Sequence, residues 1–155
     1  MQRIRIGDVE NDVQPAAVMR KLTKPLGLTD FAMNYYELEP GESFAYGFHA
    51  HEKQEEVFYV QEGTVTFETV EGDVEIGAGE LIRFGPGEYQ QGVNRGDERV
   101  VALAMGAPQD AGETEILREC ADCGERTPHR LELADGKNAI LTICEACGAD
   151  TGRFT

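Results

Sequence analysis

The stretch from His49 to Gly63 reads HAHEKQEEVFYVQEG, and it predicts both the fold and a metal site. Residues i and i+2 of a β-strand face the same way, so a strand here would project His49 and His51 together. If Glu56 begins the next strand, its carboxylate could meet the two imidazoles across the ladder. Two histidines and one carboxylate suit Fe, Mn, Ni or Zn.

An alternative is a pair of loop histidines beside a solvated acidic patch, EKQEE. For an arbitrary HxH pair that alternative would be preferred. The chain has three histidines, however, and two of them fall in this stretch. The third, His129, lies far along the chain and has no such partner in sequence.

The same stretch resembles the first motif of the cupin superfamily, HxH, then three or four residues, Glu, six residues and Gly. Four residues separate His51 from Glu56 and six separate Glu56 from Gly63, so Glu56 fits this pattern better than Glu55. The second cupin motif is similar to residues 79–94, GELIRFGPGEYQQGVN, without insertion or deletion.

Two positions depart from the cupin pattern. Gly85 stands where proline is usual, and Gln90 stands where the last metal-binding histidine belongs. The resemblance implies metal ligation by His49, His51 and Glu56. Gln90 is then either a weaker fourth ligand through its amide oxygen or no ligand at all.

Short strands with glycine-bearing turns favour an all-β sandwich or barrel. The strands we expect are residues 31–38, 57–61, 64–70, 73–76, 81–84 and 99–105. Phe44, Tyr46 and Phe48 alternate with smaller residues and His49, so we expect these aromatic rings to pack away from the histidine face. The cupin resemblance implies the same architecture, a double-stranded β-helix or jelly-roll barrel over residues 1–105.

Residues 106–114 lose the alternation and gain Gly, Pro and acidic residues, which indicates a linker. Beyond it, residues 115–155 contain all four cysteines, in two CxxC pairs separated by 20 residues: Cys120, Cys123, Cys144 and Cys147. This spacing predicts a four-cysteine zinc site, and the unit resembles a zinc ribbon. Two disulfides and a redox dithiol are the weaker alternatives. His129 is interpreted as an ordinary residue of the hairpin between the pairs.

The formal net charge is −15, from 29 acidic and 14 basic residues. Such a charge disfavours nucleic acids and anionic membranes as partners, and it is similar to that of proteins from salt-accumulating halophiles. The longest apolar run, Val100 to Met105, is too short to span a membrane. With no apolar segment near the N-terminus, we expect a cytoplasmic protein.

Two functions remain open on the sequence alone. The first is a metalloenzyme that acts on a small oxygen-bearing metabolite by dioxygenation, isomerisation or decarboxylation. The second is a non-catalytic module that binds a small molecule, or docks a protein through the zinc ribbon. The cupin resemblance also implies a homodimer formed through barrel strands.

Overall fold

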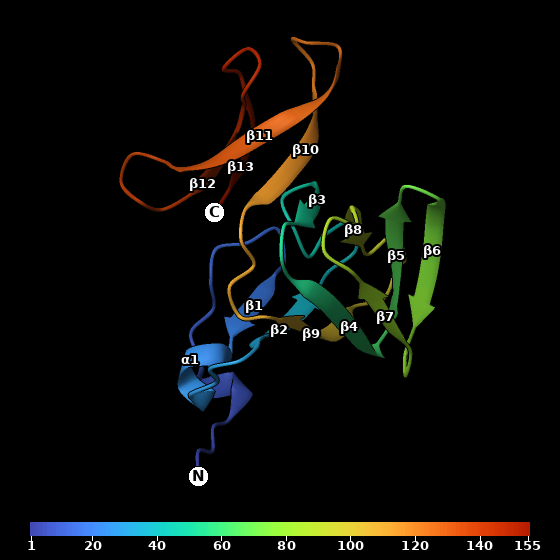
Figure 1. Ribbon diagram of the computed structural model, residues 1–155, viewed down its shortest axis with the longest axis vertical. Helices are drawn as coiled ribbons and strands as arrows, with labels where there is room; N and C mark the ends of the chain where they lie inside the picture. The colour runs from blue at the N-terminus through green and yellow to red at the C-terminus, as the bar shows by residue number, and fades with distance from the viewer.

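The computed structural model describes residues 1–155 and is built almost entirely from antiparallel strands (Figure 1). Two sheets make up the fold, one of five strands and one of eight. In order across the sheet, the five-stranded sheet contains β1 (Val18–Lys21), β2 (Ala32–Leu38), β9 (Val100–Ala107), β4 (Glu55–Glu62) and β7 (Leu81–Phe84). The all-β prediction and the jelly-roll prediction are therefore confirmed.

The eight-stranded sheet runs from the barrel into the C-terminal part of the chain without a break. Its strands, in order, are β13 (Asp150–Phe154), β12 (Ile140–Cys144), β11 (Glu125–Leu133), β10 (Thr114–Cys120), β3 (Phe48–His51), β8 (Gln90–Val93), β5 (Thr64–Thr69) and β6 (Gly72–Gly77). In Figure 1 the orange and red strands β10 to β13 rise above the barrel, joined to it beside β3.

The junction between these parts is the pairing of β10 with β3. All four residues of β3 face partners on β10, from Thr114 opposite His51 to Leu117 opposite Phe48. The expected linker, residues 106–114, overlaps the end of β9 and the first residue of β10. The division into a barrel unit and a C-terminal unit stays a prediction, but the two share one hydrogen-bonded sheet.

The apolar core fills the space between the sheets at the barrel end. Aromatic rings dominate its centre, with Phe44 lying 4.9 Å from Phe58 and 6.0 Å from Phe67 between ring centroids. The core consists of Ala16, Met19, Tyr36, Leu38, Phe44, Phe58, Val60, Val65, Phe67, Ile76, Phe84, Val100, Ala102 and Ala104. This cluster fixes the strands that carry the site residues.

The turn between β4 and β5 explains the last glycine of the first motif. Gly63 has a φ of 76°, a conformation that side chains with a Cβ rarely adopt. A Cβ at this position would also come within 2.6 Å of the Arg99 carbonyl oxygen. Both the backbone conformation and the close approach of Arg99 therefore require glycine here.

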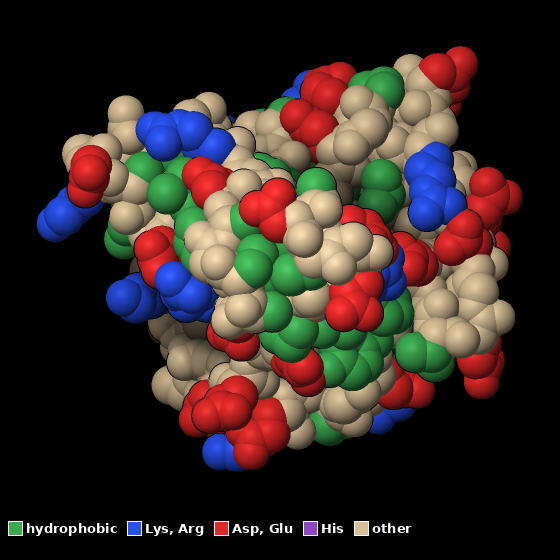
Figure 2. Space-filling model, turned by 90° about the horizontal axis from the view of Figure 1, so that it is seen from above, with side chains coloured by type: hydrophobic (Ala, Val, Ile, Leu, Met, Phe, Trp, Pro, Cys, Tyr) green, Lys and Arg blue, Asp and Glu red, His purple; other side chains and the backbone are tan.

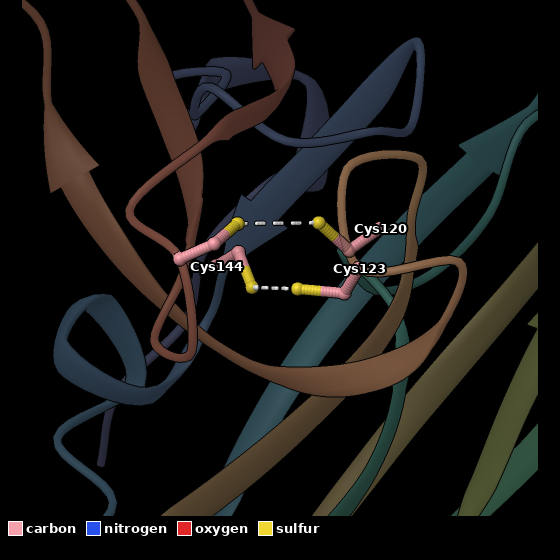
Figure 3. A group of neighbouring side chains, drawn as sticks. Cys120, Cys123 and Cys144 are labelled. Carbon is pink, nitrogen blue, oxygen red and sulfur yellow. Dashed lines mark hydrogen bonds between the residues drawn. The ribbon is translucent and has the colours of Figure 1, made fainter.

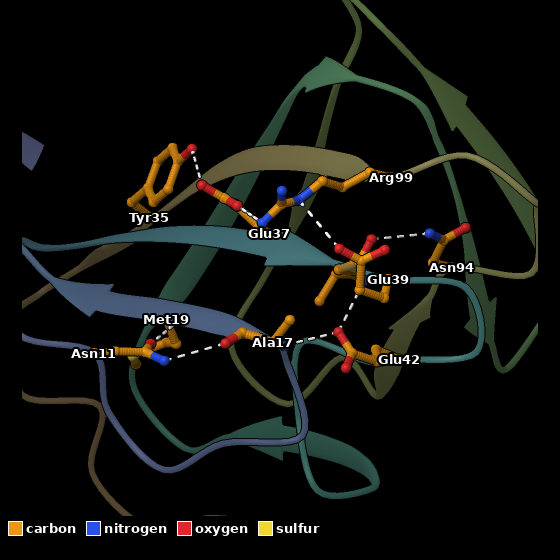
Figure 4. A network of polar contacts seen from close by, with 10 residues as sticks. Asn11, Ala17, Met19, Tyr35, Glu37, Glu39, Glu42, Asn94 and Arg99 are labelled. Carbon is orange, nitrogen blue, oxygen red and sulfur yellow. Dashed lines mark hydrogen bonds and ion pairs between the residues drawn. The ribbon is translucent and has the colours of Figure 1, made fainter. Parts of the chain in front are cut away.

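Two short helices, η1 (Ile6–Asp8) and α1 (Thr23–Leu26), lie in the N-terminal segment, which is tied to the barrel by polar contacts (Figure 4). The Ala17 amide donates to the Glu42 carboxylate at 2.7 Å. At the adjoining ends of β2 and β9, Arg99 forms ion pairs with Glu37 and Glu39. No helix is long and apolar enough to cross a membrane.

Candidate metal centre and its cavity

The structure brings His49, His51 and Glu56 together. The ligand atoms of the three residues all lie within 4.8 Å of one another, and His51 Nε2 is 3.5 Å from Glu56 Oε2. The expectation that Glu56 meets the histidines across a ladder is wrong. Strand β4 pairs with β7 and β9 in the five-stranded sheet, whereas β3 belongs to the other sheet. The carboxylate therefore reaches the imidazoles across the interior of the barrel.

His49 is oriented by a bond to its own strand. Its Nδ1 donates to the Gly47 carbonyl at 3.1 Å, which leaves the Nε2 lone pair facing the interior. Burial lowers the pKa of His49, partly opposed by the nearby Glu56 carboxylate. The imidazole is thus held neutral, which is the form that binds a metal ion.

Gln90 completes the polar group on β8, directly opposite His49. Its side-chain Nε2 donates to Glu56 Oε2 at 3.1 Å and lies 3.3 Å from His49 Nε2. The second cupin-like motif therefore places Gln90 beside His49 and Glu56. Rotation of the amide would present oxygen in place of nitrogen to the same point.

The orientation of His51 is set by a residue that lies outside the two cupin-like motifs. Its Nδ1 lies 2.8 Å from the hydroxyl of Thr114, the first residue of β10. When that hydroxyl accepts the Nδ1 proton, the Nε2 lone pair of His51 faces Glu56. Nothing in the sequence pointed to Thr114, because the register of β10 on β3 cannot be read from local pattern.

The three ligand residues open into a cavity of about 520 Å³. Barrel residues line one part, and β10 and β11 line the other through Thr114, Ile116 and His129. Contrary to expectation, Phe44 and Tyr46 line this cavity too, because residues 44–47 form bends and not a strand. Only Phe48, which stacks on Tyr89 with centroids 5.4 Å apart, turns away as predicted.

The residues present fit a divalent transition metal. Two imidazole nitrogens and one carboxylate oxygen converge from both sheets, beside the cavity. Histidine nitrogens with a single carboxylate suit Fe, Mn, Ni and Zn. The amide of Gln90 lies beside two of these three residues, His49 and Glu56.

The four cysteines also gather in one place (Figure 3). Cys120 Sγ lies 3.6 Å from Cys147 Sγ, and Cys123 Sγ lies 3.8 Å from Cys144 Sγ. All four cysteines are free, with no disulfide between them. Four thiolates around one zinc ion are about 3.8 Å apart, given a Zn–S distance of about 2.3 Å in a tetrahedron. The cluster therefore has the dimensions of a four-cysteine zinc site.

Local geometry and charge at the cysteines are consistent with a cation. Gly124 and Gly148 follow the two CxxC pairs with φ of 74° and 81°, and their amides donate back to the carbonyls of Cys120 and Cys144. The Thr127 hydroxyl, 3.1 Å from the sulfur, lowers the pKa of Cys144 to about 6. Neighbouring thiols, Cys147 first, raise the pKa of Cys123. A bound cation would stabilise all four thiolates together.

His129 lies in the hairpin between the two cysteine pairs, as expected. It is only 4% exposed on β11, and it lines the same cavity as His49 and His51. Its Nδ1 donates to the Thr127 carbonyl at 2.8 Å, while its Nε2 has no hydrogen-bond partner. No signal in the sequence distinguished it, because its neighbours on β10 and β12 are set by long-range pairing.

Comparison with known proteins supports the class of fold. Residues 34–106 match the family model described as "Cupin domain". None of the curated proteins compared matches the chain. A sugar phosphate isomerase from a cupin superfamily, from Silicibacter pomeroyi, is 19% identical with a TM-score of 0.66, and the match covers 99% of this chain and 91% of that one.

Two further solved structures are similar over most of the chain. The polyketide cyclase RemF from Streptomyces resistomycificus is 26% identical with a TM-score of 0.65, over 79% of this chain and 89% of that one. A predicted oxalate decarboxylase from Thermotoga maritima is 22% identical with a TM-score of 0.60, and the match covers 69% of this chain and 99% of that one. Residues 34–106 are therefore similar to a cupin domain, and the fold is the double-stranded β-helix of these neighbours.

Proposed function

We propose that the barrel binds one divalent transition metal through His49, His51 and Glu56 and presents it to a small oxygen-bearing metabolite. The observation that carries this proposal is the convergence of three ligand atoms within 4.8 Å beside a cavity of about 520 Å³. The metal would supply Lewis acidity towards an oxygen of the ligand. Gln90, already bonded to Glu56, is its neighbour and a weak fourth donor.

The chain's own residues would prepare the cavity for such a ligand. Gly47 and Thr114 hold the two imidazoles so that both Nε2 atoms face the interior. Phe44 and Phe58 supply apolar walls that exclude water from one side. The reaction class stays among isomerase, decarboxylase and dioxygenase types, and the named activities of the structural neighbours, isomerase, cyclase and predicted decarboxylase, support chemistry on small molecules.

A second candidate is a non-catalytic module that keeps its metal to capture a ligand. Gln90 favours this candidate, because an amide oxygen is a weaker donor than imidazole for late first-row metals and would hold the metal less firmly. Turnover of any ligand by the metal-loaded protein would decide against it.

The C-terminal unit, residues 115–155, is proposed to hold a structural Zn²⁺ on Cys120, Cys123, Cys144 and Cys147, as in a zinc ribbon. Its support is the spacing of the four sulfurs. A homodimer, a protein partner at this unit, a cytoplasmic location and a halophilic origin are further proposals, and they rest on the sequence features given above.

Two adjacent glutamates provide the test of the barrel site. Glu56 faces the histidines, whereas the Glu55 carboxylate accepts a hydrogen bond from Arg83 Nε at 2.6 Å on the surface. We expect Glu56→Gln to lose barrel metal and Glu55→Gln to retain it, measured by elemental analysis of protein purified without added metal. Zinc near one per chain should persist in both variants. Equal barrel occupancy in the two variants would show that Glu56 is not a ligand.

A further inference from the structure

The side-chain amide of Gln54 lies beside the barrel site, in a space that a glycine leaves open. Gln54 directly precedes β4, and Gly106 on β9 is the residue directly opposite Glu56. A Cβ at Gly106 would come within 2.4 Å of the carbonyl carbon of the Gln54 side chain. Opposed residues of antiparallel strands share a sheet face, with Cβ atoms about 5 Å apart. The Gln54 amide therefore occupies the place of the side chain that would neighbour Glu56.

Two backbone carbonyls fix the orientation of this amide. The Nε2 of Gln54 donates to the Pro108 carbonyl at 2.8 Å and lies 3.5 Å from the Gln109 carbonyl. A carbonyl can only accept, so the amide nitrogen must face these two oxygens and Oε1 is directed away from them. The segment that carries the carbonyls is itself anchored, because Gln109 Nε2 donates to the Leu28 and Phe31 carbonyls at 2.8 and 3.2 Å.

The oxygen of the Gln54 amide has no donor in the protein, yet it is accessible. Gln54 is 7% exposed and lines the cavity. The side-chain polar atoms that lack both a partner and accessible surface are Arg118 Nε and His129 Nε2, and Gln54 Oε1 is not among them. An acceptor left unpaired in a nearly buried residue is unfavourable and calls for an explanation. Oε1 is thus a fixed acceptor that a molecule in the cavity can reach.

We infer that Gln54 is a specificity-determining residue of the cavity, whose amide oxygen accepts a hydrogen bond from a hydroxyl group of the ligand. The inference rests on the proposed function, which places an oxygen of the same ligand at His49, His51 and Glu56. Because the amide neighbours Glu56, the hydroxyl lies within a few atoms of that oxygen. The ligand class is then a small metabolite with a hydroxyl one or two carbons from its metal-binding group, and an analogue without the hydroxyl leaves Oε1 unpaired.

Three acids of three carbons each test this inference on the full chain loaded with zinc at both sites. Lactate and 3-hydroxypropanoate carry a hydroxyl on the first and second carbon after the carboxylate, and propanoate carries none. The carboxylate serves as the metal-binding group of all three probes, because carboxylate oxygens ligate zinc. For at least one hydroxy acid, we expect the binding advantage over propanoate in calorimetry to fall about 3- to 10-fold in Gln54→Met. Any direct contact of the hydroxyl with zinc persists in this variant, so the fall belongs to Gln54.

Two further variants bracket this measurement. Gly106→Ala keeps Gln54 but displaces its amide, so the advantage of the hydroxy acid should fall there too. Gln14→Met makes the same substitution at another glutamine that lines the cavity, and it should leave the advantage unchanged.

The outcomes separate Gln54 from the metal site. An unchanged advantage in both Gln54→Met and Gly106→Ala, or an equal fall in Gln14→Met, would overturn the role of Gln54 and leave the metal proposal standing. Binding of none of the three acids to the wild type would overturn both. His51→Ala should weaken all three acids together, which would localise the carboxylate to the metal. If Gln54→Met does not fold, the side-chain amide resonances of Gln54 in the wild-type chain decide. They should shift with a hydroxy acid and not with propanoate, and equal or absent shifts would overturn the inference.

Discussion

Gln90 is the barrel residue whose replacement should strengthen metal binding. It is 2% exposed, it lies opposite His49, and its amide already contacts both His49 and Glu56. Imidazole outranks an amide oxygen as a donor for late first-row metals, so Gln90→His should raise barrel affinity for Ni²⁺ or Zn²⁺ about 10-fold or more. Competition with a chromophoric chelator would measure it.

The half-buried neighbour Gln91 provides the control for this change, because Gln91→His adds a histidine on the opposite face of β8. Its affinity should equal that of the wild type. A tighter site in Gln91→His, or a weaker one in Gln90→His, would contradict the assignment of the fourth position.

Thr114 should act on the metal through His51 without touching the metal itself. Thr114→Val keeps the branched shape and removes the hydroxyl that lies 2.8 Å from His51 Nδ1. Loss of such an orienting bond typically lowers metal affinity about 10- to 100-fold. Thr114→Ser should restore most of the affinity, and the exposed Thr64→Val on β5 should leave it unchanged. The tautomer of His51, read from its ¹⁵N shifts, should become mixed only in Thr114→Val.

At the residue scale, the sequence predicted correctly those side-chain directions that depend on the two-residue period of a strand. His49 and His51 share a face because they are two apart in a strand, and the motif spacing favoured Glu56 over Glu55 correctly as the carboxylate that faces them. It missed Thr114 and His129, because their place at the cavity depends on how β10 and β11 align with β3. Such long-range register is decided by the whole fold.

At the scale of elements, β3 is held mainly by β10. All four residues of β3 pair with β10, whereas the register with β8 contains only His49 opposite Gln90. Strand β10 in turn ends at Cys120, in the cysteine cluster. Disruption of the cysteine cluster should therefore destabilise β3, the strand that carries His49 and His51.

Cys123→Ser tests this coupling. Loss of zinc should destabilise the folded state of β10 to β13, because structural zinc binding and folding are linked. We expect hydrogen-exchange protection to fall in β10 to β13 and also in β3, with barrel metal bound more weakly, while β4 and β9 stay protected. Ala121→Ser, in the same exposed turn as Cys123 but removing no sulfur, should match the wild type. Protection lost only beyond residue 114 would instead mean that the two units are independent.

The elements predicted from sequence are those with apolar alternation. Strands β2, β4, β5, β6, β7 and β9 were predicted within about two residues of their bounds. Strand β8, which reads QQGV, and β13, which reads DTGRF, carry too few apolar residues to stand out. Strand β10 was hidden because its start fell inside the expected linker.

At the scale of the whole molecule, charge is the dominant feature. Acidic side chains are spread over the face in Figure 2, and the formal net charge is −15. Salt screens this self-repulsion, as the Debye length falls from about 10 Å at 0.1 M to about 3 Å at 1 M. Thermal unfolding should therefore shift to higher temperature as KCl rises over that range, and change little beyond it.

A neutral solute at the same osmolality is the control for the salt series. It should not reproduce the rise if screening is the cause. A midpoint that does not depend on KCl would leave the acidic surface without a halophilic explanation.

The pairing of β10 along β3 also bears on how copies of this protein meet. A chain ending at Ala107 would leave β3 as an open edge, with unpaired backbone amides and carbonyls that can template another strand. In the full chain that edge is already occupied by β10, and the outer strands are β1, β7, β6 and β13. A shortened barrel should therefore self-associate or exchange strands between copies, whereas a homodimer of the intact chain must form elsewhere than along β3.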